Sequence, residues 1–169
     1  YERQGVSFDK MNEKQRGLAL ALLESALSAH GQKTSRDIMR LNETIAELKN
    51  DWQGYGEGKY HLTVMGEPSE KEPWGWQLDG HHLVINYFVL GDQVVMTPLF
   101  VGSEPVWADS GKYEGTIVMQ KEQADGLAFM RSLTEPQQAE ARIQNEKGPF
   151  NALAEAFKDN LIVAYSAIK

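Results

Sequence analysis

The chain contains no cysteine among its 169 residues. This absence excludes disulfide bonds, zinc–thiolate sites and a thiol nucleophile together. It leaves the compartment open between cytoplasmic, periplasmic and secreted, because proteins without disulfides occur in all three. Any metal site or catalytic centre therefore has to be built from histidine, carboxylate, hydroxyl or amide groups.

Basic residues are also scarce, with 17 Lys and Arg against 24 Asp and Glu, for a net charge of −7. Nucleic acids and anionic membrane surfaces are bound through clustered basic side chains, so we expect neither as a partner. Apolar runs are short, and none approaches the roughly 20 residues that cross a bilayer. Apolar residues nevertheless make up 41% of the chain, which is enough for a globular domain with a sizeable core.

Two amphipathic helices are expected between residues 12 and 49. Asn12 with Gln15 three positions later is a capping-box pattern, in which each side chain bonds a free backbone amide. Gly31 would supply the left-handed residue that ends the first helix. The second helix is predicted to begin at Thr34. Since the connection is short, the two helices are predicted to form an antiparallel hairpin.

Strand patterns follow from residue 60 to residue 100, interrupted by the two-residue turn signals Asp79-Gly80 and Gly91-Asp92. Turns of this kind fix the pairing of the strands that flank them. We therefore expect Gln77 to lie opposite His82, and Asn86 opposite Thr97.

Beyond the strands, helices are predicted within residues 120–157 and a last strand over residues 161–165. The whole pattern predicts one α+β domain over residues 1–169. Its centre would be an antiparallel β-meander of about four strands or more, with helices packed mainly on one face.

The expected register divides the meander into an apolar and a mixed face. The apolar face, which the helices should cover, holds these side chains: Trp74, Trp76, Leu78, His81, Leu83, Ile85, Tyr87, Val89, Val94 and Met96. The mixed face gathers four polar side chains: Gln77, His82, Asn86 and Thr97. A polar cluster on a rigid sheet is a natural place for a binding site.

Residues 73–83 read Pro-Trp-Gly-Trp-Gln-Leu-Asp-Gly-His-His-Leu, and this block resembles the signature of the family called domain of unknown function 3500. Residues 66–69 and 102–105 are similar to the same family, and the resemblance extends to about residue 142. The resemblance implies longer bacterial proteins, of which this chain would be a segment. It implies no activity, cofactor or catalytic residue.

His81 and His82 are the leading candidates for catalytic residues. Neighbours on a strand point to opposite faces, so the pair would not chelate one ion unless a bulge intervened. His82 could instead join His61 or Glu67 in binding zinc, iron or manganese. The alternative is structural, with His81 packed and hydrogen-bonded beside the turn and His82 as a polar sheet residue.

Gln77, Asn86 and Thr97 are candidate substrate-binding residues, because they could hydrogen-bond a polar ligand beside His82. The same side chains could simply form a ladder that holds the sheet together. Trp107 lies in a loop, where its ring could stack on a flat ligand.

Acidic residues in the loops form another candidate group, since paired carboxylates bind hard cations and hydrolyse glycosides. The group comprises Glu67, Glu70, Glu72, Glu104 and Asp109. A solvated acidic surface is the alternative interpretation of these residues.

These residues support two hypotheses about function. The first is a small-molecule enzyme, a metal-assisted hydrolase with His82 at its centre and a divalent transition metal as cofactor. The second is a non-catalytic binding or assembly module, whose partner would be another protein or the remainder of a longer chain. A concave pocket with converging titratable groups would favour the enzyme, and an exposed apolar patch around Phe88 and Leu99 would favour the module.

Overall fold

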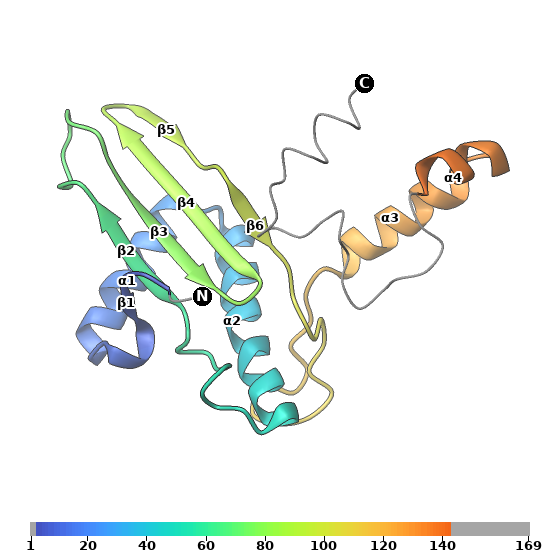
Figure 1. The fold of residues 1–169 in the computed structure, drawn as a ribbon, viewed down its shortest axis with the longest axis horizontal. Helices are drawn as coiled ribbons and strands as arrows, with labels where there is room; N and C mark the ends of the chain where they lie inside the picture. The colour runs from blue at the N-terminus through green and yellow to red at the C-terminus, as the bar shows by residue number, and fades with distance from the viewer. Residues whose placement is uncertain (1–2, 143–169) are drawn as a thin grey trace. The chain divides into compact units, whose positions relative to one another are not determined.

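The computed structural model describes residues 3–142. The end of the helical stretch expected up to residue 157 therefore lies outside the described residues, as does the strand expected over residues 161–165. The chain divides into two compact units, residues 1–123 and 124–169. The first unit contains the whole sheet and the first two helices (Figure 1).

Two helices precede the sheet: α1 (Glu13–Ala26) and α2 (Ala29–Lys49). The expected capping box is confirmed, because the Gln15 amide donates to Asn12 Oδ1 over 2.9 Å and the Asn12 amide donates to Gln15 Oε1 over 2.8 Å. The expectation that Gly31 ends the first helix is wrong. Ser28 caps α2 instead, its hydroxyl accepting from the Gly31 amide over 3.1 Å, so that Gly31 lies in the first turn of α2.

Six antiparallel strands form one sheet. They are β1 (Val6–Ser7), β2 (His61–Met65), β3 (Trp74–Gly80), β4 (Leu83–Leu90), β5 (Gln93–Val95) and β6 (Leu99–Val101). Strands β1 to β5 are neighbours in chain order, and β6 pairs with β4 beyond the end of β5 (Figure 1). The expected α+β class with an antiparallel meander is confirmed.

Three shorter elements complete the described structure: the 3-10 helix η1 (Phe8–Lys10), α3 (Gln120–Ser132) and α4 (Glu135–Ala141). Within residues 3–142, no helix combines the length and the apolar character that crossing a bilayer requires.

One face of the sheet and the two long helices enclose the core. Trp76 and Leu78 of β3 are buried in the same cluster as Leu23 of α1 and Ile38 and Leu41 of α2. The apolar face was therefore identified correctly in its centre. The edge of the expected apolar face is not buried like its centre, since Val94 is 50% exposed and Met96 is 39% exposed.

The turn between β3 and β4 differs from the expected one. Asp79 and Gly80 continue β3 and pair with Val84 and Leu83, so that His81 and His82 occupy the turn. Gln77 therefore lies opposite Asn86 and not opposite His82. The pairing partner of Gln77 differs from the expected one by an even number of residues, so the faces of the two strands were still predicted correctly.

Tertiary contacts explain why Asp79-Gly80 does not form the turn. Asp79 is buried and its carboxylate pairs with Arg3 over 3.3 Å. A Cβ at Gly80 would lie 2.1 Å from Cδ1 of Tyr60, so this glycine admits an aromatic ring against the strand. Both residues thus serve the packing of β3, and the local preference for a turn is overridden.

The other side of β4 shows a second change of register. Val89 pairs with Val94 across Gly91-Asp92 as expected, but β6 pairs Leu99 with Ile85 and Phe100 with Val84. The link formed by residues 96–98 is therefore one residue longer than a continuous register would need. The side chains of β6 consequently point to the faces opposite to those expected. The expected pairing of Asn86 with Thr97 is wrong for this reason.

Candidate metal centre

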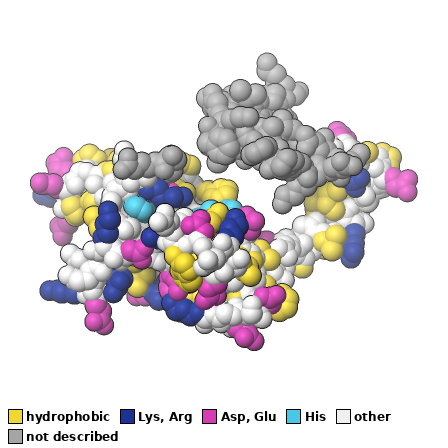
Figure 2. All heavy atoms as spheres, turned by 60° about the horizontal axis from the view of Figure 1, so that its bottom comes forward, with side chains coloured by type: hydrophobic (Ala, Val, Ile, Leu, Met, Phe, Trp, Pro, Cys, Tyr) yellow, Lys and Arg dark blue, Asp and Glu magenta, His cyan; other side chains and the backbone are white. Residues whose placement is uncertain are grey.

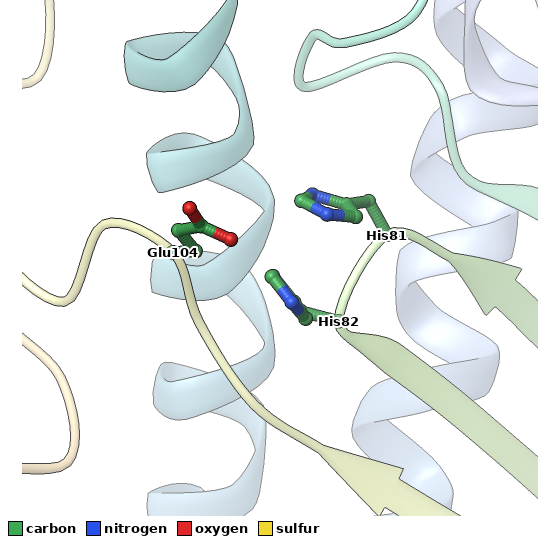
Figure 3. A group of neighbouring side chains, drawn as sticks. All are labelled: His81, His82 and Glu104. Atoms are coloured by element: carbon green, nitrogen blue, oxygen red, sulfur yellow. The ribbon is translucent and has the colours of Figure 1, made fainter. Parts of the chain in front are cut away.

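Two histidines and one carboxylate converge at the β3–β4 turn. Each of His81, His82 and Glu104 offers one ligand atom, and these atoms all lie within 4.8 Å of one another. The histidines come from the turn, and Glu104 comes from the loop that follows β6. Figure 3 shows the Glu104 carboxylate directed toward the two imidazole rings.

The histidines converge because they lie in a turn and not in a strand. His82 adopts a left-handed backbone conformation, with φ of 61°. The alternation of side chains that separates neighbours on a strand does not apply there, and the two ring centroids are 3.8 Å apart. Adjacent histidines can therefore face one ion without a bulge, contrary to our expectation from the sequence.

Two hydrogen bonds hold this turn and bring the Glu104 loop to it. The buried Tyr60 hydroxyl donates to the His81 carbonyl over 2.8 Å. The Gly102 amide donates to the His82 carbonyl over 2.7 Å. Glu104 follows Gly102 by two residues, so the second bond fixes the position from which its carboxylate reaches the rings.

Asn42 of α2 determines the tautomer of His81. Its Nδ2 donates to the Gly56 carbonyl over 2.8 Å, which leaves Oδ1 facing His81 Nδ1 at 3.0 Å. Because Oδ1 can only accept, the proton of the neutral ring lies on Nδ1 and the lone pair lies on Nε2. A hydrogen bond of this kind to the second ring nitrogen orients metal-binding histidines in general.

Both histidines are poor bases in this environment. Burial, reinforced by the neighbouring His82 ring, lowers the pKa of His81 to about 4, against the opposing effect of Glu104. Burial also lowers the pKa of His82. Neutral imidazoles are the form that binds metals, so no proton has to be displaced from His81 at neutral pH.

His82 also carries a buried polar atom without a partner. Its Nδ1 has no hydrogen bond to any group in the described part of the chain. Buried imidazole nitrogens are normally satisfied, because an unmet one costs about 1–3 kcal/mol. Four other buried polar atoms within residues 3–142, among them His61 Nδ1, also lack a partner, but the His82 nitrogen is the one beside a second histidine and a carboxylate.

Tyr55 and Lys49 form the adjoining wall. The Tyr55 ring meets His81 edge-on, with centroids 5.1 Å apart. Lys49 Nζ donates to the Tyr55 hydroxyl over 3.1 Å, and this bond, with a further contribution from Glu104, raises the pKa of the lysine. The side of the centre next to His81 therefore carries a permanent positive charge.

The other expected metal ligands lie elsewhere. His61 lies opposite Asp79 on β2, where burial lowers its pKa. Glu67 follows the far end of β2, near Trp74, and is exposed. The structure thus separates Glu67 from His82 by the length of the β2–β3 hairpin.

The expected substrate-binding residues form a separate network. Gln77 Nε2 donates to Asn86 Oδ1 over 2.7 Å, and Asn86 Nδ2 donates to the Pro98 carbonyl over 2.7 Å. Asn86 lies four residues along β4 from His82, or about 13 Å. Thr97 is exposed beside this network. These bonds tie β3, β4 and the segment before β6 together.

Trp107 follows Glu104 by three residues and is 56% exposed. Its backbone forms an isolated β-bridge with Ile117. Sequence reasoning did not select Asn42, Tyr55 or Tyr60, which support the histidines from distant parts of the chain. Glu104 was noticed only as one of several acidic loop residues. Its place in residues 102–105, which resemble the family, was the signal that could have singled it out.

A family model described as "Protein of unknown function (DUF3500)" matches residues 1–169. No curated protein and no solved structure matches the chain. The resemblance carried by residues 73–83 is therefore confirmed, and the turn histidines and the Glu104 loop both lie in stretches on which that resemblance rests.

Proposed function

The chain belongs to the DUF3500 family of proteins of unknown function, and we propose that it is a metal-assisted hydrolase of small molecules. In this proposal His81, His82 and Glu104 bind one divalent transition metal. The convergence of three ligand atoms within 4.8 Å is the observation that carries it.

The donor set favours catalysis over a structural role. Structural zinc sites are closed by four protein ligands, whereas two histidines and a glutamate are a known set for catalytic zinc. The same combination with open positions also suits iron. Three protein ligands would leave room for water and for a substrate oxygen, and Glu104 is exposed, which gives access from solvent.

The surrounding residues suit this chemistry. A metal bound here would lower the pKa of its water toward about 7 and polarise a carbonyl or phosphoryl oxygen. Asn42 would keep the His81 Nε2 lone pair on the ion. Lys49 would favour substrates with a negatively charged or strongly polarised group on the His81 side.

Metal content tests the proposal directly. Elemental mass spectrometry of untagged protein should find about one equivalent of a transition metal, by the one-site geometry. His82→Ala and Glu104→Gln should each lose it. Glu67→Gln is the matched control, since it makes the same chemical change at the far end of β2 and should retain the metal.

A different pattern would identify a different site. Loss of metal from Glu67→Gln but not from Glu104→Gln would favour the set His82, His61 and Glu67. No metal in any variant, before or after incubation with zinc, iron(II) and manganese, would overturn the proposal. If the metal is bound as expected, metal-dependent hydrolysis of a panel of small esters, amides and phosphate esters would define the reaction.

An assembly module is the second candidate, because the β4–β6 region exposes large apolar side chains. Phe88 is 45% exposed and Phe100, which pairs with Val84 on the same face of β4, is 47% exposed, whereas Leu99, 46% exposed, pairs with Ile85 and lies on the opposite face. Patches of this kind mark interaction surfaces in many proteins. Bound metal without any turnover, together with self-association that Phe88→Ser abolishes in sedimentation experiments, would favour this alternative.

A further inference from the structure

A second site lies between the helices, away from the histidines. A cavity of about 510 Å³, open to solvent, is lined by η1, α1, α2 and residues 57–58. This volume is in the range of pockets that hold small organic ligands. Its lining includes neither His81, His82 nor Glu104, so its contents would be independent of the proposed metal.

Helical spacing aligns the lining residues. Arg16, Gly17 and Leu20 follow one another along one side of α1, and Arg36 and Met39 are spaced by one turn on α2. Each helix thus brings one arginine and one apolar side chain to the cavity. Phe8 of η1 adds to the apolar surface.

The two arginines are available for a ligand. Lys and Arg side chains are interspersed with Asp and Glu on the face seen in Figure 2, so most charges have opposite charges nearby. Within residues 3–142, however, neither the Arg16 nor the Arg36 guanidinium makes a hydrogen bond or an ion pair. Two unpaired guanidinium groups at one cavity are an arrangement that binds carboxylates.

Most acidic groups of the same cavity are already engaged. Asp9 pairs with Lys59 over 3.0 Å, and Glu43 pairs with Lys112 over 2.7 Å. Glu57 accepts from the Tyr113 hydroxyl and lies 3.9 Å from Lys112. Glu13 remains at the exposed rim, one turn before Arg16. Although they are engaged, the carboxylates of Glu43 and Glu57 can each accept further hydrogen bonds, because a carboxylate oxygen carries more than one lone pair.

Gly17 of α1 also lines this cavity. Glycine is among the least favourable residues inside a helix, and Gly17 lies within α1. A Cβ at this position would meet no atom within 4 Å, so packing does not require the glycine. Gly80 and Gly58 differ, because a Cβ there would collide with Tyr60 and Asp9. The missing side chain at Gly17 leaves the wall of the cavity open.

We propose that this cavity binds a small aliphatic carboxylate that carries an amino or hydroxyl group at its other end. Arg16 and Arg36 bind the carboxylate, and Phe8, Leu20 and Met39 contact the carbon chain. The distal donor group reaches the carboxylate oxygens of Glu43 and Glu57.

Three probes of equal chain length separate these contributions: 6-aminohexanoate, hexanoate and hexylamine. Binding is measured by isothermal titration calorimetry and ligand-observed NMR at concentrations up to ~10 mM, a range that covers weak small-ligand affinities. Both carboxylates should bind, 6-aminohexanoate more tightly, and hexylamine should not. Failure of both carboxylates to bind would overturn the proposal.

Matched variants locate the site. Arg36→Gln should weaken binding of both carboxylates about tenfold or more, as expected for a charged hydrogen bond. Arg40→Gln is the control, because Arg40 lies one turn further along α2 and pairs with Asp37 over 3.0 Å. Equal affinities in the two variants would contradict the assignment.

Gly17 variants separate binding from folding. Gly17→Ala should raise the melting temperature by about 2–4 °C, because alanine favours the helix. Gly17→Leu should keep the helical circular dichroism and abolish carboxylate binding by filling the cavity. Unchanged binding in a folded Gly17→Leu protein would refute the site. His82→Ala should leave carboxylate binding unchanged, which distinguishes this proposal from the metal centre.

Discussion

Asn42 is the residue through which the metal centre can be perturbed without touching a proposed ligand. Its Oδ1 lies 3.0 Å from His81 Nδ1, and its Nδ2 donates to the Gly56 carbonyl over 2.8 Å. Asn42→Ala removes both bonds. Loss of the partner that orients a metal-binding histidine typically weakens metal binding 10- to 100-fold, or about 1.4–2.7 kcal/mol.

The same substitution also destabilises the fold, since it leaves the Gly56 carbonyl without its partner beside a buried residue. We expect a loss of about 1–3 kcal/mol in the free energy of unfolding. Asn42→Asp separates the two effects. The carboxylate still accepts from His81 Nδ1, but it cannot donate to Gly56.

Zinc affinity is measured by competition with a chromophoric chelator at pH 7.5, and stability by urea unfolding of the metal-free proteins. Asn42→Asp should lose stability yet bind zinc at least as tightly as the unchanged protein. Asn42→Ala should lose both. Equal zinc affinity in all three proteins, or equal losses in the two variants, would refute the assigned orientation of His81.

Three further predictions concern the turn. Gly80→Ala should destabilise the fold by about 1–3 kcal/mol in urea unfolding, because its Cβ would meet the Tyr60 ring at 2.1 Å, whereas Gly17→Ala should not destabilise it; equal effects would contradict the close-approach argument. Tyr60→Phe should cost about 1 kcal/mol and weaken zinc binding, since the His81 carbonyl loses its donor; unchanged zinc affinity would show that the turn is held without it. In the metal-free protein, the pKa of His81 is lowered to about 4, below its unfolded value, so its contribution to stability is full above pH 6.5 and is lost as the pH falls toward 4. Because the ring is half-buried, we expect this loss to be about 1–2 kcal/mol in urea unfolding, and His81→Gln should flatten that part of the pH profile.

Several local sequence signals predicted elements of this fold correctly where no distant contact competed with them. The Asn12–Gln15 capping box and the Gly91-Asp92 turn both lie at exposed positions, and both formed as expected. Asp79-Gly80 is the stronger turn signal, but Arg3 and the Tyr60 ring engage its two residues. Those partners lie far away in the sequence, so no local pattern could have revealed them.

The candidate site was predicted in part for the same reason. His81 and His82 stood out by their type and by the family resemblance. Their convergence depended on which two residues form the turn, and the third member, Glu104, is brought in by one backbone bond from Gly102 to His82. The network of Gln77 and Asn86 was predicted to share a face, and it does, but it lies along the strand from the histidines.

X-ray absorption spectroscopy of the zinc-loaded protein identifies the ligands of the ion. We expect two imidazole nitrogens at about 2.0–2.1 Å and a carboxylate oxygen at about 2.0–2.2 Å, with solvent in the remaining position. His82→Ala should lose one imidazole and Glu104→Gln the carboxylate. A spectrum without histidine, or one that neither substitution alters, would contradict a metal centre at the β3–β4 turn.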